Sequence, residues 1–114
     1  MPRWSKAVTK MELEELYRSL IPKLRATARR AGYALGVHGS LKRDLDLIAV
    51  PWVQGAVTPQ VLAKRISLAA CGLYTINRQQ RWERKPHGRM AIALMIGRRA
   101  YIDLSVCKPT SRKT

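Results

Sequence analysis

Hydrophobic residues recur with two distinct periods along the chain. Across residues 9–31 they lie three and four positions apart, a spacing that predicts one buried face of an α-helix. Thr9 suits the position that caps this helix and Gly32 suits its end, while Pro22 is expected to kink or divide it. The predicted buried stripe comprises Leu13, Leu16, Tyr17, Leu20, Leu24 and Ala28.

A second, shorter helix is predicted after Thr58-Pro59, because Thr caps helices well and Pro suits their first position. This helix is expected to run as far as Cys71 and to end at Gly72. Its predicted buried side comprises Val61, Leu62, Ile66, Leu68 and Ala69.

Four other segments have the hydrophobic runs and the two-residue alternation of β-strands. The short link at Gly39-Ser40 predicts an antiparallel hairpin for the first two, and Gly97-Arg98-Arg99 joins the last two. Residues 73–88 are polar and basic and are expected to form a loop. Together these elements predict an α+β fold, in which two main helices pack on one face of a small mixed or antiparallel β-sheet. The predicted strands cover residues 33–37, 44–50, 90–96 and 100–106.

The length of 114 residues predicts a single domain, residues 1–114, with a flexible basic arm at 1–8 and a flexible tail at 108–114. Lys and Arg number 22 against 7 Asp and Glu, which gives a formal net charge of +15. Such a charge attracts polyanions, of which nucleic acid is the commonest and an anionic membrane surface the lesser alternative.

Membrane insertion and secretion are not expected. No segment approaches the ~20 apolar residues that span a bilayer, and the start of the chain lacks the apolar run of a signal peptide. Cys71 and Cys107 are isolated in the sequence, which favours reduced thiols and a cytoplasmic protein.

Acidic residues are scarce, and two of them stand one residue apart in a predicted strand. Asp44 and Asp46 therefore project from the same face of that strand, and Asp103 projects in the same way from the last strand. If these two strands are neighbours, three carboxylates converge, and this set can bind two Mg²⁺ ions. The alternative is that each Asp pairs with an Arg on the surface of the sheet.

A Gly39-Ser40 turn before Asp44-Leu45-Asp46-Leu47, with a later Asp103 strand, resembles the DNA polymerase β-like nucleotidyltransferase superfamily in its minimal form. The same His-Gly-Ser…Asp-Leu-Asp core is similar to that of small phage and prophage proteins. The resemblance implies that Asp44 and Asp46 bind both Mg²⁺ ions, and that Asp103 binds one and helps to deprotonate the attacking hydroxyl. It also implies that Gly39 and Ser40 bind the phosphates of a nucleotide.

Two functions stay open, because only Leu41, Lys42 and Arg43 separate the Gly-Ser turn from the first Asp, where the superfamily has room for a helical turn. The first is an enzyme that transfers a nucleoside monophosphate from an NTP to a hydroxyl of nucleic acid, such as RNA or tRNA. The second is a degenerate module that binds nucleic acid, or a phage or host protein, without chemistry. Cations that could neutralise nucleotide phosphates are Lys42, Arg43, Arg98 and Arg99.

Other basic residues offer candidate contacts to nucleic acid. In the segment 77–85, Trp82 could stack on a base while neighbouring arginines meet phosphates, or the segment could be an ordinary solvated loop. An outer stripe of the first helix is either a solvated face or a track for phosphates. A companion protein or a second copy of the chain could complete the pocket. The residues concerned are Arg78, Arg81, Trp82 and Arg84 in the segment, Arg98 and Arg99 between the last two strands, and Arg18, Arg25 and Arg29 on the stripe.

Overall fold

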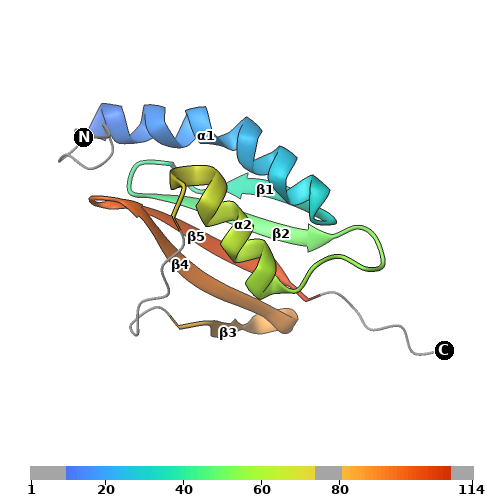
Figure 1. Cartoon of the computed structure of the whole chain (residues 1–114). Helices are drawn as coiled ribbons and strands as arrows, with labels where there is room; N and C mark the ends of the chain where they lie inside the picture. The colour runs from blue at the N-terminus through green and yellow to red at the C-terminus, as the bar shows by residue number, and fades with distance from the viewer. Residues whose placement is uncertain (1–9, 74–80, 109–114) are drawn as a thin grey trace.

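The computed structural model describes residues 10–73 and 81–108 (Figure 1). The chain has an α+β fold with two α-helices and a five-stranded mixed sheet, so the predicted fold class is confirmed. Predictions for the basic arm, for the Thr9 cap, for Arg78 and for the last residues of the tail fall outside the described residues. The helices are α1, Lys10–Arg30, and α2, Pro59–Cys71.

The sheet has the strand order β1-β2-β5-β4-β3, so β1 and β3 are its two edges. Strands β2 and β5 are parallel, and every other neighbouring pair is antiparallel. A short 3-10 turn, Pro86–Gly88, links β3 to β4 within the region that was predicted to be a loop. The strands are β1, Tyr33–His38; β2, Asp44–Pro51; β3, Glu83–Lys85; β4, Arg89–Gly97; and β5, Ala100–Cys107.

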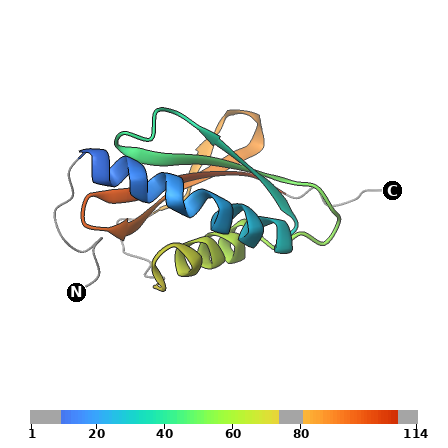
Figure 2. The ribbon, with the colours of Figure 1, turned by 90° about the horizontal axis from the view of Figure 1, so that it is seen from above.

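Both helices cover the same face of the sheet and lie side by side when seen from above (Figures 1 and 2). The apolar stripe of α1 packs into the core as predicted. The helix is continuous through Pro22, so the expected division at this residue is wrong; Pro22 lies on the exposed side. Neither described helix has the length and apolar character needed to cross a membrane.

The predicted buried side of α2 is partly wrong. Val61 and Leu68 are 39% and 42% exposed, whereas Ala63 and Ser67 are buried beside Leu62 and Ile66. Ser67 can lie on the buried side of α2 because its Oγ donates a hydrogen bond to the backbone carbonyl of Leu73 at 2.6 Å. The covered side of this helix therefore includes Leu62 and Ile66 but is rotated away from Val61 and Leu68.

The central strands alternate strictly between the two faces of the sheet. Leu45 and Leu47 of β2, with Ile102 and Leu104 of β5, are fully buried beneath the helices. The residues between them point to the opposite face, which carries no helix (Figure 1). This second surface is called the open face below.

Candidate functional site

The two strands that carry the aspartates are neighbours in the sheet. In the parallel register of β2 and β5, Asp46 lies directly across from Asp103, and Asp44 lies across from Tyr101. All four residues project onto the open face because the leucines and isoleucine between them face the helices. The strand pairing on which the candidate site depends is therefore present.

The three carboxylates repel one another. Burial raises the pKa of Asp46 above its ordinary value, and the negative charges of Asp103 and Asp44 raise it further. His38, which faces Asp46 across the β1–β2 ladder, acts in the opposite direction. His38 offsets only part of the repulsion, so the approach of a further positive charge to the three carboxylates is favourable.

Within the part of the chain that the structure describes, no Lys or Arg side chain forms an ion pair with this cluster. The ion pairs found there join Arg18 to Glu14 and Lys85 to Glu83, and none involves the three aspartates. The alternative in which surface arginines pair with each Asp is therefore not what the structure contains. The chain has a net charge of +15, yet within the described residues these three acids form no ion pair with Lys or Arg.

The connection between β1 and β2 is a tight turn that touches the acidic cluster. Gly39 has φ +80°, and a Cβ at this position would collide with Oδ2 of Asp46. The backbone N–H of Lys42 donates to Oγ of Ser40 at 3.3 Å, and Leu41 is buried with φ +63°. Glycine is thus required both for the backbone conformation and for the close approach to the carboxylate.

Tyr17 supports the cluster from beneath, a role that the sequence analysis did not identify. Its buried hydroxyl donates to the carbonyl of Arg43 at 2.7 Å and accepts from the N–H of Tyr101 at 3.1 Å. It thereby ties the residue before Asp44 to the start of β5. Burial raises the pKa of Tyr17, and the charges of Asp44 and Asp46 add to this effect. A phenol within a leucine stripe was the available signal, since a buried hydroxyl needs a partner.

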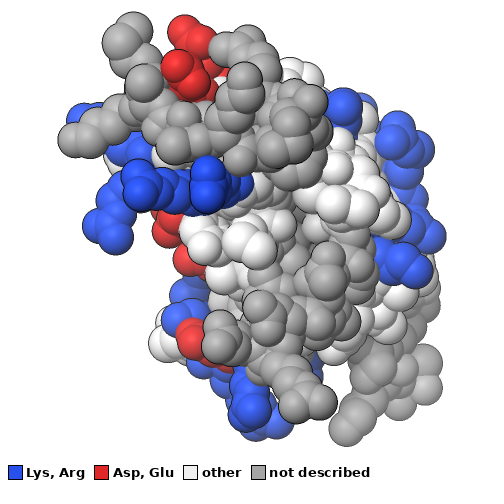
Figure 3. All heavy atoms as spheres, turned by 60° about the vertical axis from the view of Figure 1, so that its left-hand side comes forward, with Lys and Arg blue, Asp and Glu red and all other residues white. Residues whose placement is uncertain are grey.

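Basic residues gather at the end of the sheet where β2 and β5 begin. Lys42 and Arg43 precede β2, and Arg98 and Arg99 precede β5; because these strands are parallel, both turns lie at the same end (Figure 1). All four side chains are exposed. Figure 3 brings this end forward and shows basic side chains beside acidic ones.

A cavity of about 380 Å³ adjoins two of the carboxylates, those of Asp44 and Asp103, on the open face; Asp46 does not line it. Asp44, Tyr101 and Asp103 form one side of it, and the other side includes Arg81 and Lys85. Of the three predicted nucleic-acid contacts that the structure describes in this segment, Arg81, Trp82 and Arg84, only Arg81 lines this cavity.

The neighbours of Arg81 lie elsewhere. Trp82 is half-buried and packs against the core, so its ring is partly engaged within the protein. Arg84 is exposed and alternates with Glu83 and Lys85 along β3, which directs it to the opposite face. The charges of β3 thus divide between the two sides of the sheet.

The donor set suits Mg²⁺ bound together with a substrate rather than by the protein alone. Among the described residues no three His, Cys, Asp or Glu side chains form a group placed to hold a metal ion. Mg²⁺ usually takes one or two carboxylates and completes its shell with water and substrate phosphates. The facing pair Asp46 and Asp103, with Asp44 beside them, meets that requirement.

Comparisons with protein-family models, with curated proteins and with solved structures find no match to this chain. The likeness to the nucleotidyltransferase superfamily therefore depends on the motif residues themselves. The geometry of those residues is the basis for assigning a function.

Proposed function

We propose that this protein is an Mg²⁺-dependent nucleotidyltransferase that transfers a nucleoside monophosphate from an NTP to a hydroxyl of a nucleic acid. The observation that carries the proposal is the register of β2 and β5, which sets Asp46 across from Asp103 beside Asp44. These carboxylates form no ion pair with Lys or Arg in the described part of the chain. Such a cluster of repelling carboxylates is suited to binding metal cations that arrive together with the substrate.

The protein's own groups would divide the work. The facing pair Asp46 and Asp103, with Asp44 beside them, would hold Mg²⁺ together with substrate phosphates, and the bound metal would supply charge for the attacking hydroxyl and the leaving pyrophosphate. Asp103, at the border of the cavity, would accept the proton of the acceptor hydroxyl. Gly39 brings a backbone turn against Asp46, which would allow a phosphate to approach closely.

The cations around the cavity suggest where phosphates would lie. Arg81 and Lys85 line the wall opposite the aspartates, and the turn that holds Arg98 and Arg99 lies at the adjacent end of the sheet. They would replace the helical turn that the superfamily has after its Gly-Ser pair. An acceptor strand of RNA fits the net charge of +15.

The direct test is to incubate the protein with each labelled NTP, MgCl₂ and bulk RNA, and to measure label transfer. Asp46→Asn should lower transfer on the order of 100-fold or more, because the site loses a carboxylate that would hold the metal and with it charge that stabilises the transition state. Glu15→Gln, which removes an equal charge from the exposed side of α1, should leave transfer unchanged. Absence of transfer with all four NTPs and several RNA and DNA acceptors would refute the proposal.

A second candidate is a nucleic-acid-binding module without chemistry. It is favoured by the β1–β2 connection, in which only three residues separate Ser40 from Asp44, where the superfamily has room for a helical turn. In that case Asp46→Asn should leave RNA affinity unchanged, or raise it by removing a repelling charge. MgCl₂ should then shift the melting temperature of the native protein and of the variant equally.

A further inference from the structure

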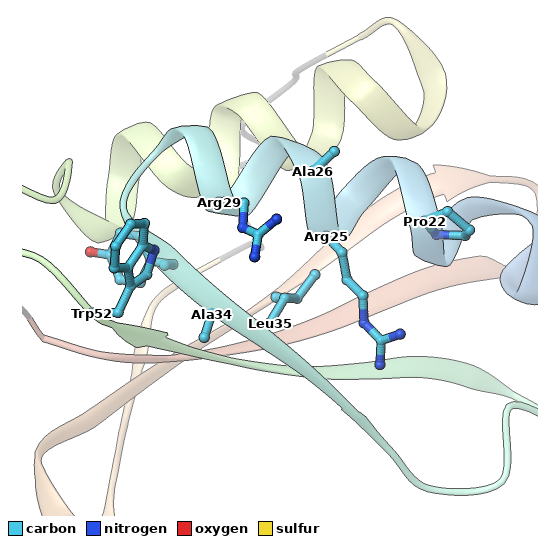
Figure 4. A pocket seen from close by; sticks show the side chains of 8 residues that line it. Pro22, Arg25, Ala26, Arg29, Ala34, Leu35 and Trp52 are labelled. Atoms are coloured by element: carbon cyan, nitrogen blue, oxygen red, sulfur yellow. The ribbon is translucent and has the colours of Figure 1, made fainter.

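A second concave surface lies between α1 and the edge strand β1, lined by none of the three aspartates (Figure 4). Its volume is about 610 Å³, which is within the range of ligand-binding sites in proteins. Helix α1 contributes Arg25 and Arg29, strand β1 contributes Tyr33 and Leu35, and Trp52 follows the end of β2. This surface is called the α1–β1 groove.

Two positive charges face this groove without partners. Arg25 and Arg29 are exposed, stand one helical turn apart and extend from α1 over β1 in Figure 4. Within residues 10–73 and 81–108, the ion pairs involve other basic residues, and neither of these two arginines has a carboxylate partner. A ligand with repeated negative charges is therefore the natural complement of this side of the groove.

Trp52 is presented on a fixed backbone. Trp52 is 59% exposed, while its backbone N–H donates to the carbonyl of Gly32 at 3.0 Å. The N–H of Val57 donates to the carbonyl of Ala31, also at 3.0 Å, and a Cβ on Gly32 would lie 2.8 Å from Cα of Ala56. The segment after β2 is thus fastened to the end of α1. Its indole offers a flat surface at little further cost in conformational entropy.

We propose that the α1–β1 groove binds single-stranded nucleic acid, with a base stacked on Trp52 and neighbouring phosphates bound by Arg25 and Arg29. An aromatic platform beside a row of cations is the arrangement by which proteins hold single strands with little sequence preference. The spacing of one helical turn between the arginines matches consecutive phosphates of an extended strand, and Leu35 provides an apolar floor. This inference stands without the proposed enzyme activity, because it uses none of the aspartates.

An extended peptide added to the free edge of β1 is the competing occupant. Strand addition depends on backbone hydrogen bonds and would draw little from two guanidinium groups. The net charge of +15 and the two unpaired arginines favour a phosphate strand. Oligonucleotide binding therefore decides between the two.

The test uses the full chain and fluorescently labelled 12-mers of oligo(U) and oligo(dT), with a duplex of equal length for comparison, followed by anisotropy over a range of salt. The double variant Arg25→Gln/Arg29→Gln should weaken single-strand binding at least 10-fold. It should also reduce the slope of log affinity against log salt by about 1.4, since each lost phosphate contact removes about 0.7. Arg30→Gln is the matched control: it removes one exposed charge from the same end of α1, outside the groove.

The platform has its own pair of variants. Trp52→Leu should weaken binding by about 10-fold, within the range for loss of one stacked base, and Trp52→Phe should restore most of it. Asp46→Asn should leave this binding intact even if it abolishes nucleotide transfer, so failure of one proposal is visible apart from the other. The groove proposal is overturned if the double variant and Trp52→Leu bind single strands as tightly as the Arg30→Gln control does. A peptide or a second copy of the chain would then be the occupant of the groove.

Discussion

The two faces of strands β2 and β5 differ completely although they are built from alternate residues of the same segments. On the covered face, Leu47 and Leu104 face each other in the register and are inaccessible to solvent. One residue earlier in each strand, Asp46 and Asp103 face each other on the open face. The first pair is held by burial of apolar surface, whereas the second pair is held together against its own repulsion.

The difference shows which residues packing accounts for and which it does not. Apolar residues on the covered face follow from the need to build a core beneath two helices. No comparable requirement selects three acids on the open face of a strongly basic chain, and their mutual repulsion opposes stability. The expected effects of substitutions therefore differ in sign between the two faces.

The largest effect should come from the covered face. Leu104→Ala removes a fully buried side chain and should lower the free energy of unfolding by ~2–5 kcal/mol, measured by urea denaturation. The control is Ser105→Ala, the next residue along β5 on the open face, which should change stability by less than ~0.5 kcal/mol. Equal effects of the two substitutions would contradict the assignment of the faces.

An intermediate effect is expected where the core reaches the open face. Tyr17→Phe leaves the carbonyl of Arg43 and the N–H of Tyr101 without their shared partner, at a cost of ~1–3 kcal/mol. Tyr101→Phe removes an exposed hydroxyl and should cost less than ~0.5 kcal/mol. Thermal denaturation followed by circular dichroism measures both. A Tyr17→Phe variant as stable as the native protein would show that the hydroxyl is not structurally required.

The smallest effect should have the opposite sign. The pKa of Asp46 is raised in the folded chain, so between its ordinary and its raised value the folded state binds more protons than the unfolded state. The contribution of Asp46 to stability therefore falls as the pH rises through that window. Asp46→Asn removes the repulsion and should stabilise the protein at neutral pH by roughly 0.2–1 kcal/mol.

This gain has a characteristic pH dependence. It should shrink as the pH falls below the ordinary range of a carboxyl, where the native Asp46 is protonated and repels its neighbours no longer. Urea denaturation at several pH values measures it, with Glu15→Gln as the control for loss of a charge elsewhere. A destabilised Asp46→Asn variant at neutral pH would mean that the carboxylate makes a favourable contact that outweighs the repulsion.

Alternation alone was sufficient to predict the central strands and the face on which the aspartates lie. In β5, the pattern from Ala100 to Val106 places Ile102 and Leu104 in the core and Asp103 outside, as the structure has them. The fifth strand was not predicted, because Glu83–Lys85 is only three residues long and charged throughout. An edge strand without apolar residues leaves no periodic signal.

Side-chain hydrogen bonds explain what the hydrophobic pattern missed. Ser67, rather than Leu68, lies on the covered side of α2 because its hydroxyl donates to the carbonyl of Leu73. This contact reaches past the end of the helix, so the spacing of hydrophobic residues does not predict it. The hydroxyl of Tyr17 likewise joins two segments distant in sequence. The α1–β1 groove depends on the way that the segment after β2 closes on α1, and this too is a property of tertiary structure.

The two edge strands of the sheet differ in how readily another copy of the chain could pair with them. Strand β3 is three residues long and fully charged, which discourages another chain from pairing with it. Strand β1 is twice as long, carries no Lys, Arg, Asp or Glu, and is flanked instead by Arg25 and Arg29 of α1. Electrostatic repulsion between like-charged copies therefore protects the longer edge, and concentrated salt, which screens it, should make the purified protein prone to edge-to-edge aggregation.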